Sequence, residues 1–94
     1  MIHSFADPRL EAFWRTGKSR RIPPELHPAL KRKLVMLHAA ETLQALRQPP
    51  ANRLDALKGD LRGQHAIRVN EQWRLVFRWD GSNVHALRLT DCHS

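Results

Sequence analysis

The stretch LKGDLRGQHAIRVNEQWRLVF, residues 57–77, decides the fold. Apolar and polar residues alternate on both sides of residues 70–72 (Asn-Glu-Gln), a pattern typical of two strands joined by a tight turn. If these three residues form the turn, Arg68 lies directly opposite Arg74. The sequence therefore places two permanent positive charges side by side on one face of a β-hairpin.

The alternation predicts two different faces for this hairpin. The face toward the core is expected to carry Ile67, Val69, Trp73, Leu75, Phe77 and Trp79, and the open face Ala66, Arg68, Arg74, Val76 and Arg78. Because like charges directly opposite each other destabilise a sheet, the arginines need an anion or carboxylates to meet them. Phosphate suits the flat fork of guanidinium donors. The alternative is a solvated arginine face balanced by Asp or Glu from neighbouring strands.

Further strands are predicted on both sides of the hairpin. Residues 54–57 precede it, followed by a turn between Gly59 and Gly63, and residues 83–89 come after a turn at Asp80-Gly81. With the hairpin strands at 65–69 and 73–79, short turns between consecutive strands predict an antiparallel meander. The turn at residues 58–60 (Lys-Gly-Asp) would bring the Lys58 ammonium near the open face. Residues 2–5 also alternate and could form a short strand.

Two helices are predicted before the strands. Asp7-Pro8 is a helix start, Leu10, Phe13 and Trp14 share one face, and Gly17 ends the helix. A longer helix begins near Pro28, with Leu30, Leu34 and Leu37 on one face and Met36, Ala40 and Leu43 extending the stripe. Residues 47–53 are expected to be a linker. The predicted class is α+β, a single domain over residues 1–94 with an N-terminal helical hairpin on one face of a small antiparallel sheet.

The charge, the cysteine count and the lack of long apolar runs limit the classes of function that this chain can have. Sixteen Lys and Arg against nine Asp and Glu give a net charge of +7, which favours a polyanion or an acidic partner. One cysteine allows no internal disulfide. The first residues do not have the pattern of a secretory signal, and no apolar run approaches the ~20 residues of a membrane helix. A cytoplasmic protein is expected.

Several motifs resemble those of one protein family. They are IPPEL before the longer helix, RLDALKGDLRGQHAIRVNEQWRLVFRW, and a terminal Asp-x-His, together with MIHSF and TGKS nearer the start. They cover nearly the whole chain and resemble the HigB branch of the RelE/ParE toxins. The resemblance implies a toxin of a type II toxin–antitoxin system, similar to ribosome-dependent endonucleases that cut mRNA in the ribosomal A site. It also implies a HigA-like antitoxin with a helix-turn-helix fold. The toxin itself would contact DNA only indirectly, through this antitoxin.

The resemblance further implies a metal-independent endoribonuclease in which the 2′-hydroxyl attacks the neighbouring phosphate. Lys58 and Arg74 match positions that stabilise the phosphate and the transition state, and Arg68 matches a basic position near the substrate. Asp91 and His93 match the terminal acid and histidine. Arg78 and Cys92 are the remaining candidates for contact with the substrate.

Two residues depart from the pattern of this family. Asp55 stands where histidine is usual, and Cys92 replaces a tyrosine that could stack on a base and carry a proton. Both changes predict weaker cleavage. The alternative is therefore a weak or non-catalytic toxin that binds the ribosome or another target such as gyrase. A basic module that binds only an acidic protein is a third interpretation.

The other polar candidates have competing structural roles. Asp91 could instead be a carboxylate that offsets the arginines, and the alternation places His65 on the core side. His85, Cys92 and His93 lack the spacing of zinc ligands. We predict no metal and no cofactor.

Overall fold

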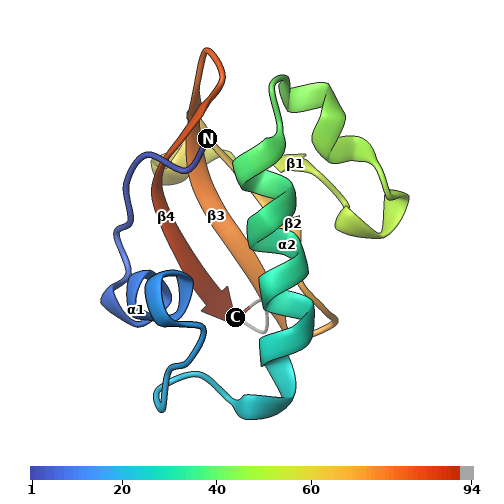
Figure 1. Cartoon of the computed structure of the whole chain (residues 1–94). Helices are drawn as coiled ribbons and strands as arrows, with labels where there is room; N and C mark the ends of the chain where they lie inside the picture. The colour runs from blue at the N-terminus through green and yellow to red at the C-terminus, as the bar shows by residue number, and fades with distance from the viewer. Residues whose placement is uncertain (92–94) are drawn as a thin grey trace.

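The computed structural model describes residues 1–91 as two helices and a four-stranded sheet (Figure 1). The strands are antiparallel and lie in the order β1-β2-β3-β4, and both helices cover the same face. This confirms the predicted α+β meander. The elements are α1 (Pro8–Thr16), η1 (Pro24–Leu26), α2 (His27–Ala39), η2 (Leu43–Arg47), η3 (Pro50–Asn52), β1 (Asp55–Ala56), η4 (Gly59–Leu61), β2 (Gln64–Arg68), β3 (Trp73–Asp80) and β4 (Asn83–Asp91), where η denotes a 3₁₀ turn.

The β2–β3 hairpin has the register that the alternation predicted. Ile67 lies opposite Leu75, and Arg68 lies opposite Arg74. The turn forms because the Asn70 side-chain oxygen accepts hydrogen bonds from the Gln72 and Trp73 N–H groups, both at 2.8 Å. Such an Asn side chain replaces a backbone acceptor and fixes a tight turn.

The core lies between the helices and the sheet, as the helical and strand periodicities predicted. The buried side chains from both helices and three strands include Leu10, Phe13, Leu30, Leu34, Leu37, Ile67, Leu75, Phe77 and Leu87. Trp73 and Trp79 pack against this core but are only partly buried. The two helices contact each other through the ring pairs Phe13–His27 and Trp14–His38, with centroids 4.8 and 5.3 Å apart.

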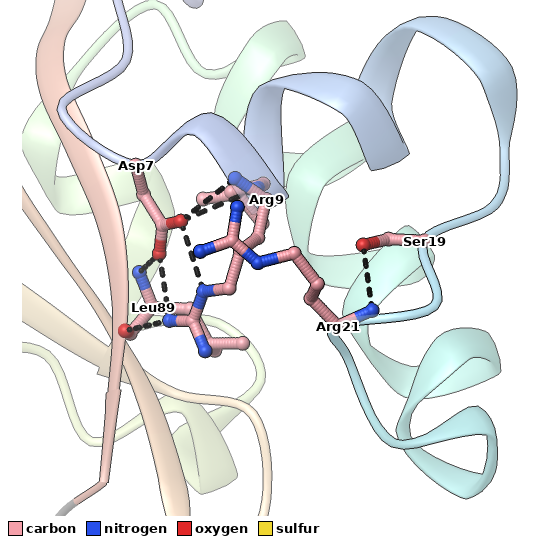
Figure 2. Close-up of polar contacts among 6 residues, drawn as sticks. Asp7, Arg9, Ser19, Arg21 and Leu89 are labelled. Atoms are coloured by element: carbon pink, nitrogen blue, oxygen red, sulfur yellow. Dashed lines mark hydrogen bonds and ion pairs between the residues drawn. The ribbon is translucent and has the colours of Figure 1, made fainter.

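Helix α1 begins and ends as predicted. Asp7 is its N-cap, accepting hydrogen bonds from the Arg9 and Leu10 N–H groups, and Gly17 ends it in the left-handed conformation with φ 78°. The Asp7 carboxylate also receives the Arg9 guanidinium at 2.9 Å and the Leu89 N–H at 3.1 Å (Figure 2). One buried carboxylate therefore ties α1 to β4.

These contacts also set the ionisation of Asp7. Burial alone would raise the pKa of its carboxyl group. The hydrogen bond from Arg9, the Leu89 N–H, the Arg9 charge and the Leu10 N–H outweigh burial and hold the pKa below its ordinary value of 3.8. Asp7 is therefore ionised in the folded protein at neutral pH.

The segment at residues 2–5 pairs with β4 without forming the continuous strand that its alternation predicted. Two isolated parallel bridges join Ile2 to Val84 and Phe5 to Leu87. Between them, Ala86 has φ 52°, which shifts the β4 ladder and leaves no regular edge to extend. The Ser4 hydroxyl instead accepts the Ala86 N–H at 2.9 Å.

The segment after α2 also differs from prediction. The helix ends at Ala39, and Ala40 is extended, so the apolar stripe does not continue to Leu43 on the same helix. The expected linker at residues 47–53 contains no α-helix. It does contain the 3₁₀ turn η3 and the last residue of η2. In residues 1–91, no helix has both the length and the apolar character needed to cross a membrane.

Candidate functional site

The sheet face opposite the helices has an apolar floor beneath polar side chains. Ala66 and Val76 lie opposite each other there and are 3% and 1% exposed, so this face is less open than the alternation predicted. Arg88 of β4 donates a 2.7 Å hydrogen bond to the Gln64 side chain of β2, on the other side of β3. The aliphatic parts of such long side chains cover the floor while their polar ends stay above it.

Arg68 and Arg74 line one hollow on this face. Its volume is about 350 Å³, and its lining residues are Arg53, Leu54, Asp55, Ala66, Ile67, Arg68 and Arg74. The ion pairs within residues 1–91 are Asp7–Arg9, Glu11–Arg15 and Asp80–His85. In that part of the chain, no carboxylate forms an ion pair with Arg68, Arg74 or Arg78. Asp55 of β1 does line the hollow with Arg68 and Arg74, so an arginine face balanced by a neighbouring strand stays an alternative prediction.

Arg74 has a buried donor without a partner among the described residues. Its Nε is shielded from solvent and has no hydrogen-bond acceptor among residues 1–91. Leaving a buried donor unsatisfied costs about 1–3 kcal/mol. An anion in the hollow would lie against the Arg74 side chain, and phosphate oxygens match the charge and the fork of its guanidinium group.

A second hollow adjoins the first. Its volume is about 300 Å³, and its lining residues are Lys33, Ala51, Arg53, Arg68, Val69, Asn70 and Glu71. Arg53 and Arg68 line both hollows. The two hollows therefore share two arginines among their lining residues.

Asn52 anchors the loop that carries Arg53. It is fully buried; its side-chain oxygen accepts a 2.6 Å hydrogen bond from Lys33 of α2, and its Nδ2 donates to the carbonyls of Leu46 and Gln48 at 3.0 and 3.3 Å. Burial, and then the nearby Arg32 charge, lowers the pKa of Lys33. The loop is thus fixed to the helix layer from inside.

Asn52→Ala is expected to lower the free energy of unfolding by roughly 2–4 kcal/mol, because it leaves two carbonyls and the Lys33 ammonium without their partner. Urea unfolding at neutral pH measures the change. Gln48→Ala, an exposed side chain in the same loop, is the matched control and should change stability by less than about 0.5 kcal/mol. A loss below 1 kcal/mol for Asn52→Ala would show that the loop does not depend on this side chain.

Lys58 and Arg78 lie toward the opposite end of β2 from Arg68. Lys58 immediately precedes η4, and Arg78 is opposite Gln64, with its Nη1 3.6 Å from where a Cβ would stand on Gly63. Neither residue lines the hollow that contains Arg74. The structure thus brings Arg68 and Arg74 together and sets Lys58 and Arg78 apart from them, and the roles of all four remain predictions.

Asp91 is the last residue of β4 and the last C-terminal candidate that the structure describes. Thr90 lies opposite Arg74, so the last residues of β4 are beside the arginine pair. Asp91 lies opposite Trp73, and its carboxylate accepts a 3.4 Å hydrogen bond from Gln72. Cys92 and His93 lie outside the described residues, and the site roles of Asp91, Cys92 and His93 remain predictions.

The histidine predictions can be tested only in part. His65 stacks against Phe77, with ring centroids 6.2 Å apart, on the core side as predicted. Among residues 1–91, no three His, Cys, Asp or Glu side chains are grouped closely enough to hold a metal ion.

Sequence reasoning missed three residues of this face. Arg53 follows a Pro-rich linker without periodicity, and no pattern indicates where its side chain lies. Arg88 was missed because the ladder shift near Ala86 interrupts the alternation in β4. Gln64 was missed because the predicted strand began at residue 65, whereas β2 begins at Gln64. Asp55 was singled out only as a departure from a motif, and the structure places it in the hollow.

Comparisons with known proteins agree with this architecture. YafQ from E. coli has a similar fold, with a TM-score of 0.65 and 16% identity, over 98% of this chain and 92% of that one. The YoeB–YefM complex from Staphylococcus aureus contains a chain that matches with a TM-score of 0.54 and 15% identity, over 94% of this chain and 95% of that one. These likenesses concern the fold.

Sequence comparisons identify the family. Toxin HigB-1 of Vibrio cholerae is 46% identical over 80 residues, 84% of each chain, and Endoribonuclease HigB of Proteus vulgaris is 26% identical over 93 residues, covering 99% of this chain and all of that one. Residues 3–93 match the HigB-like toxins, described as the RelE-like toxin of the type II toxin–antitoxin system HigB. The chain therefore belongs to the HigB-like toxins of type II toxin–antitoxin systems.

Proposed function

We propose that this HigB-like toxin is a metal-independent endoribonuclease that cuts mRNA in the ribosomal A site. The observation that carries the proposal is the Arg68–Arg74 pair, because two arginines that lie directly opposite each other on neighbouring strands line one hollow. The relative from Proteus vulgaris named Endoribonuclease HigB supports the same reaction.

The reaction needs no group outside the RNA and the protein. The 2′-oxygen attacks the adjacent phosphorus and loses its proton to a base, and the bond from phosphorus to the 5′-oxygen breaks as an acid protonates that oxygen. The products are a 2′,3′-cyclic phosphate and a 5′-hydroxyl. Arg68 and Arg74 would hold the non-bridging oxygens as negative charge builds on them.

The remaining roles follow from the family resemblance. Asp91 and His93 are the proposed acid–base groups, with Cys92 next in the chain to both. Asp91 is paired with Trp73, so its side chain leaves β4 on the other face from that of Arg74, and its proposed role rests on the resemblance alone.

The resemblance gives Lys58 a role in stabilising the phosphate and the transition state. Because Lys58 and Arg78 do not line the hollow of Arg74, we propose instead that both hold the RNA toward the other end of β2. Asp55, a carboxylate in the hollow of Arg68 and Arg74, would weaken the attraction for phosphate, and with Cys92 it is proposed to make cleavage less efficient.

The partner of a type II toxin is its antitoxin, and a chain of the YoeB–YefM complex shares this fold. We propose a HigA-like helix-turn-helix protein as the antitoxin, with the ribosome and its mRNA as the cytoplasmic target. Contact with DNA would then be only through the antitoxin.

Purified ribosomes programmed with a defined mRNA and an empty A site test the reaction. We expect breaks confined to the A-site codon, with 2′,3′-cyclic phosphate and 5′-hydroxyl ends. A single 2′-deoxynucleotide at the mapped break should abolish cutting there, because it removes the attacking group. Uncut mRNA, or products with a 3′-hydroxyl and a 5′-phosphate, would contradict the proposed reaction.

A further inference from the structure

Arg53 occupies a defined position at the junction of the two hollows. It lines both of them, and it directly follows η3. Its backbone is left-handed, with φ 47°, and its N–H donates to the Pro50 carbonyl at 3.1 Å. A left-handed conformation costs a residue with a Cβ roughly 1–2 kcal/mol, so the surrounding structure must hold it there.

The surrounding structure includes the buried Asn52 and its bonds to α2 and to the loop carbonyls. The backbone beside Arg53 is thereby fixed before any ligand arrives. Only the side chain of Arg53 would then have to be ordered on binding an anion, which costs less conformational entropy than ordering the loop as well.

Charge favours an anion in both hollows. The first has Arg53, Arg68 and Arg74 against one carboxylate, Asp55, and the second has Lys33, Arg53 and Arg68 against Glu71. Consecutive nucleotides present consecutive phosphates. Two cationic hollows that share the lining residues Arg53 and Arg68 match this repeat.

We infer that Arg53 contacts the phosphate adjacent to the one that is cut, so that the two hollows bind two consecutive linkages of the mRNA. This rests on the proposed function and extends it, since it names a substrate contact in a loop whose sequence carries no periodic signal. Arg68, shared by both hollows, would lie between the two phosphates.

A double substitution in protein and RNA tests the inference. Single-turnover cleavage on programmed ribosomes is measured for the wild type, Arg53→Gln, Arg53→Lys and the control Arg47→Gln, which removes an exposed arginine from η2. Each protein is tested on mRNA with ordinary linkages and on mRNA with one neutral methylphosphonate, placed immediately 5′ or immediately 3′ of the mapped break.

We expect Arg53→Gln to raise the toxin concentration for half-maximal cleavage by roughly 10-fold or more, the usual scale for a charged hydrogen bond, and Arg53→Lys to raise it less. At one of the two flanking positions, the methylphosphonate should weaken the wild type by a similar factor and have little further effect on Arg53→Gln. Such non-additivity identifies a direct contact. Arg47→Gln should match the wild type on every RNA.

Equal behaviour of Arg53→Gln and Arg47→Gln, or full additivity with both methylphosphonates, would overturn the inference while leaving the proposed reaction intact. Unchanged cleavage by Arg53→Gln combined with weaker binding of the purified antitoxin would overturn it in favour of an acidic protein segment in these hollows. Failure of the wild type to cut would overturn the proposed function and this inference together.

Discussion

Replacing Arg74 with glutamine is expected to slow mRNA cleavage by roughly 100- to 1,000-fold, the usual loss when one transition-state donor is removed. Glutamine keeps part of the length of arginine but lacks the charge and the guanidinium fork. Arg74→Lys restores the charge without the fork and should recover only part of the rate. Single-turnover cleavage on programmed ribosomes at saturating toxin measures the effect.

The same Arg74→Gln substitution is not expected to destabilise the fold. Arg74 faces Arg68, and its buried Nε has no acceptor within residues 1–91, so removing it relieves repulsion between like charges and the cost of an unsatisfied donor. We expect the free energy of unfolding to stay the same or to rise by up to about 1 kcal/mol. A residue with a merely structural role would lose stability and activity together.

Arg20→Gln is the matched control for charge, because Arg20 is exposed in the segment between the helices. It should leave both the cleavage rate and the stability unchanged. A rate for Arg74→Gln within a few-fold of this control would remove Arg74 from the proposed reaction. Loss of the folded state in Arg74→Gln would contradict the interpretation of the arginine pair as a site that trades stability for binding.

The largest effect on stability is expected at Asp7. Asp7→Ala should lower the free energy of unfolding by about 3–5 kcal/mol, because it removes a helix cap and leaves Arg9 and the Leu89 N–H without the buried carboxylate. Glu11→Ala is the control in the same helix. Its exposed pair with Arg15 should contribute less than about 0.5 kcal/mol.

The same carboxylate gives a pH dependence of known sign. Its pKa is lower in the folded protein than its ordinary value of 3.8, so ionised Asp7 stabilises the fold fully above that value. The contribution is lost as the pH falls through the lower folded pKa. The stability difference between the wild type and Asp7→Asn should therefore be constant from pH 5 to 7 and shrink below about pH 4. A difference that persists unchanged to pH 2 would contradict this.

The β2–β3 hairpin and helix α1 could be predicted from the sequence because short-range interactions determine them. Asn70 supplies the acceptor that closes the β2–β3 turn, and the alternation on either side then fixes the opposition of Arg68 and Arg74. Asp7 and Gly17 mark the ends of α1 because each has a conformational or hydrogen-bonding property that a helix terminus needs. In each case, neighbouring residues in the chain determine the structure.

The phase of β4 and the position of Arg53 could not be predicted, because they depend on contacts between residues distant in the chain. Nothing in the sequence around Ala86 signals its left-handed conformation, so the phase of β4, and with it the place of Arg88, could not be predicted. Arg53 reaches the hollow because Asn52 is bonded to Lys33, 19 residues away in the chain. Helical and strand periodicity carry no information about such a loop.

The first residues of the chain protect one edge of the sheet from pairing with strands of other molecules. Backbone groups from Met1 to Ala6 bond along β4 at Val84 and Leu87, and Asp7 takes the Leu89 N–H, while β1 at the other border of the sheet is only two residues long. An edge strand with unpaired N–H and C=O groups can pair with a strand of another molecule, which leads to aggregation. Because the N-terminal segment bonds along one border and the strand at the other border is short, both borders offer little free backbone for an incoming strand to pair with.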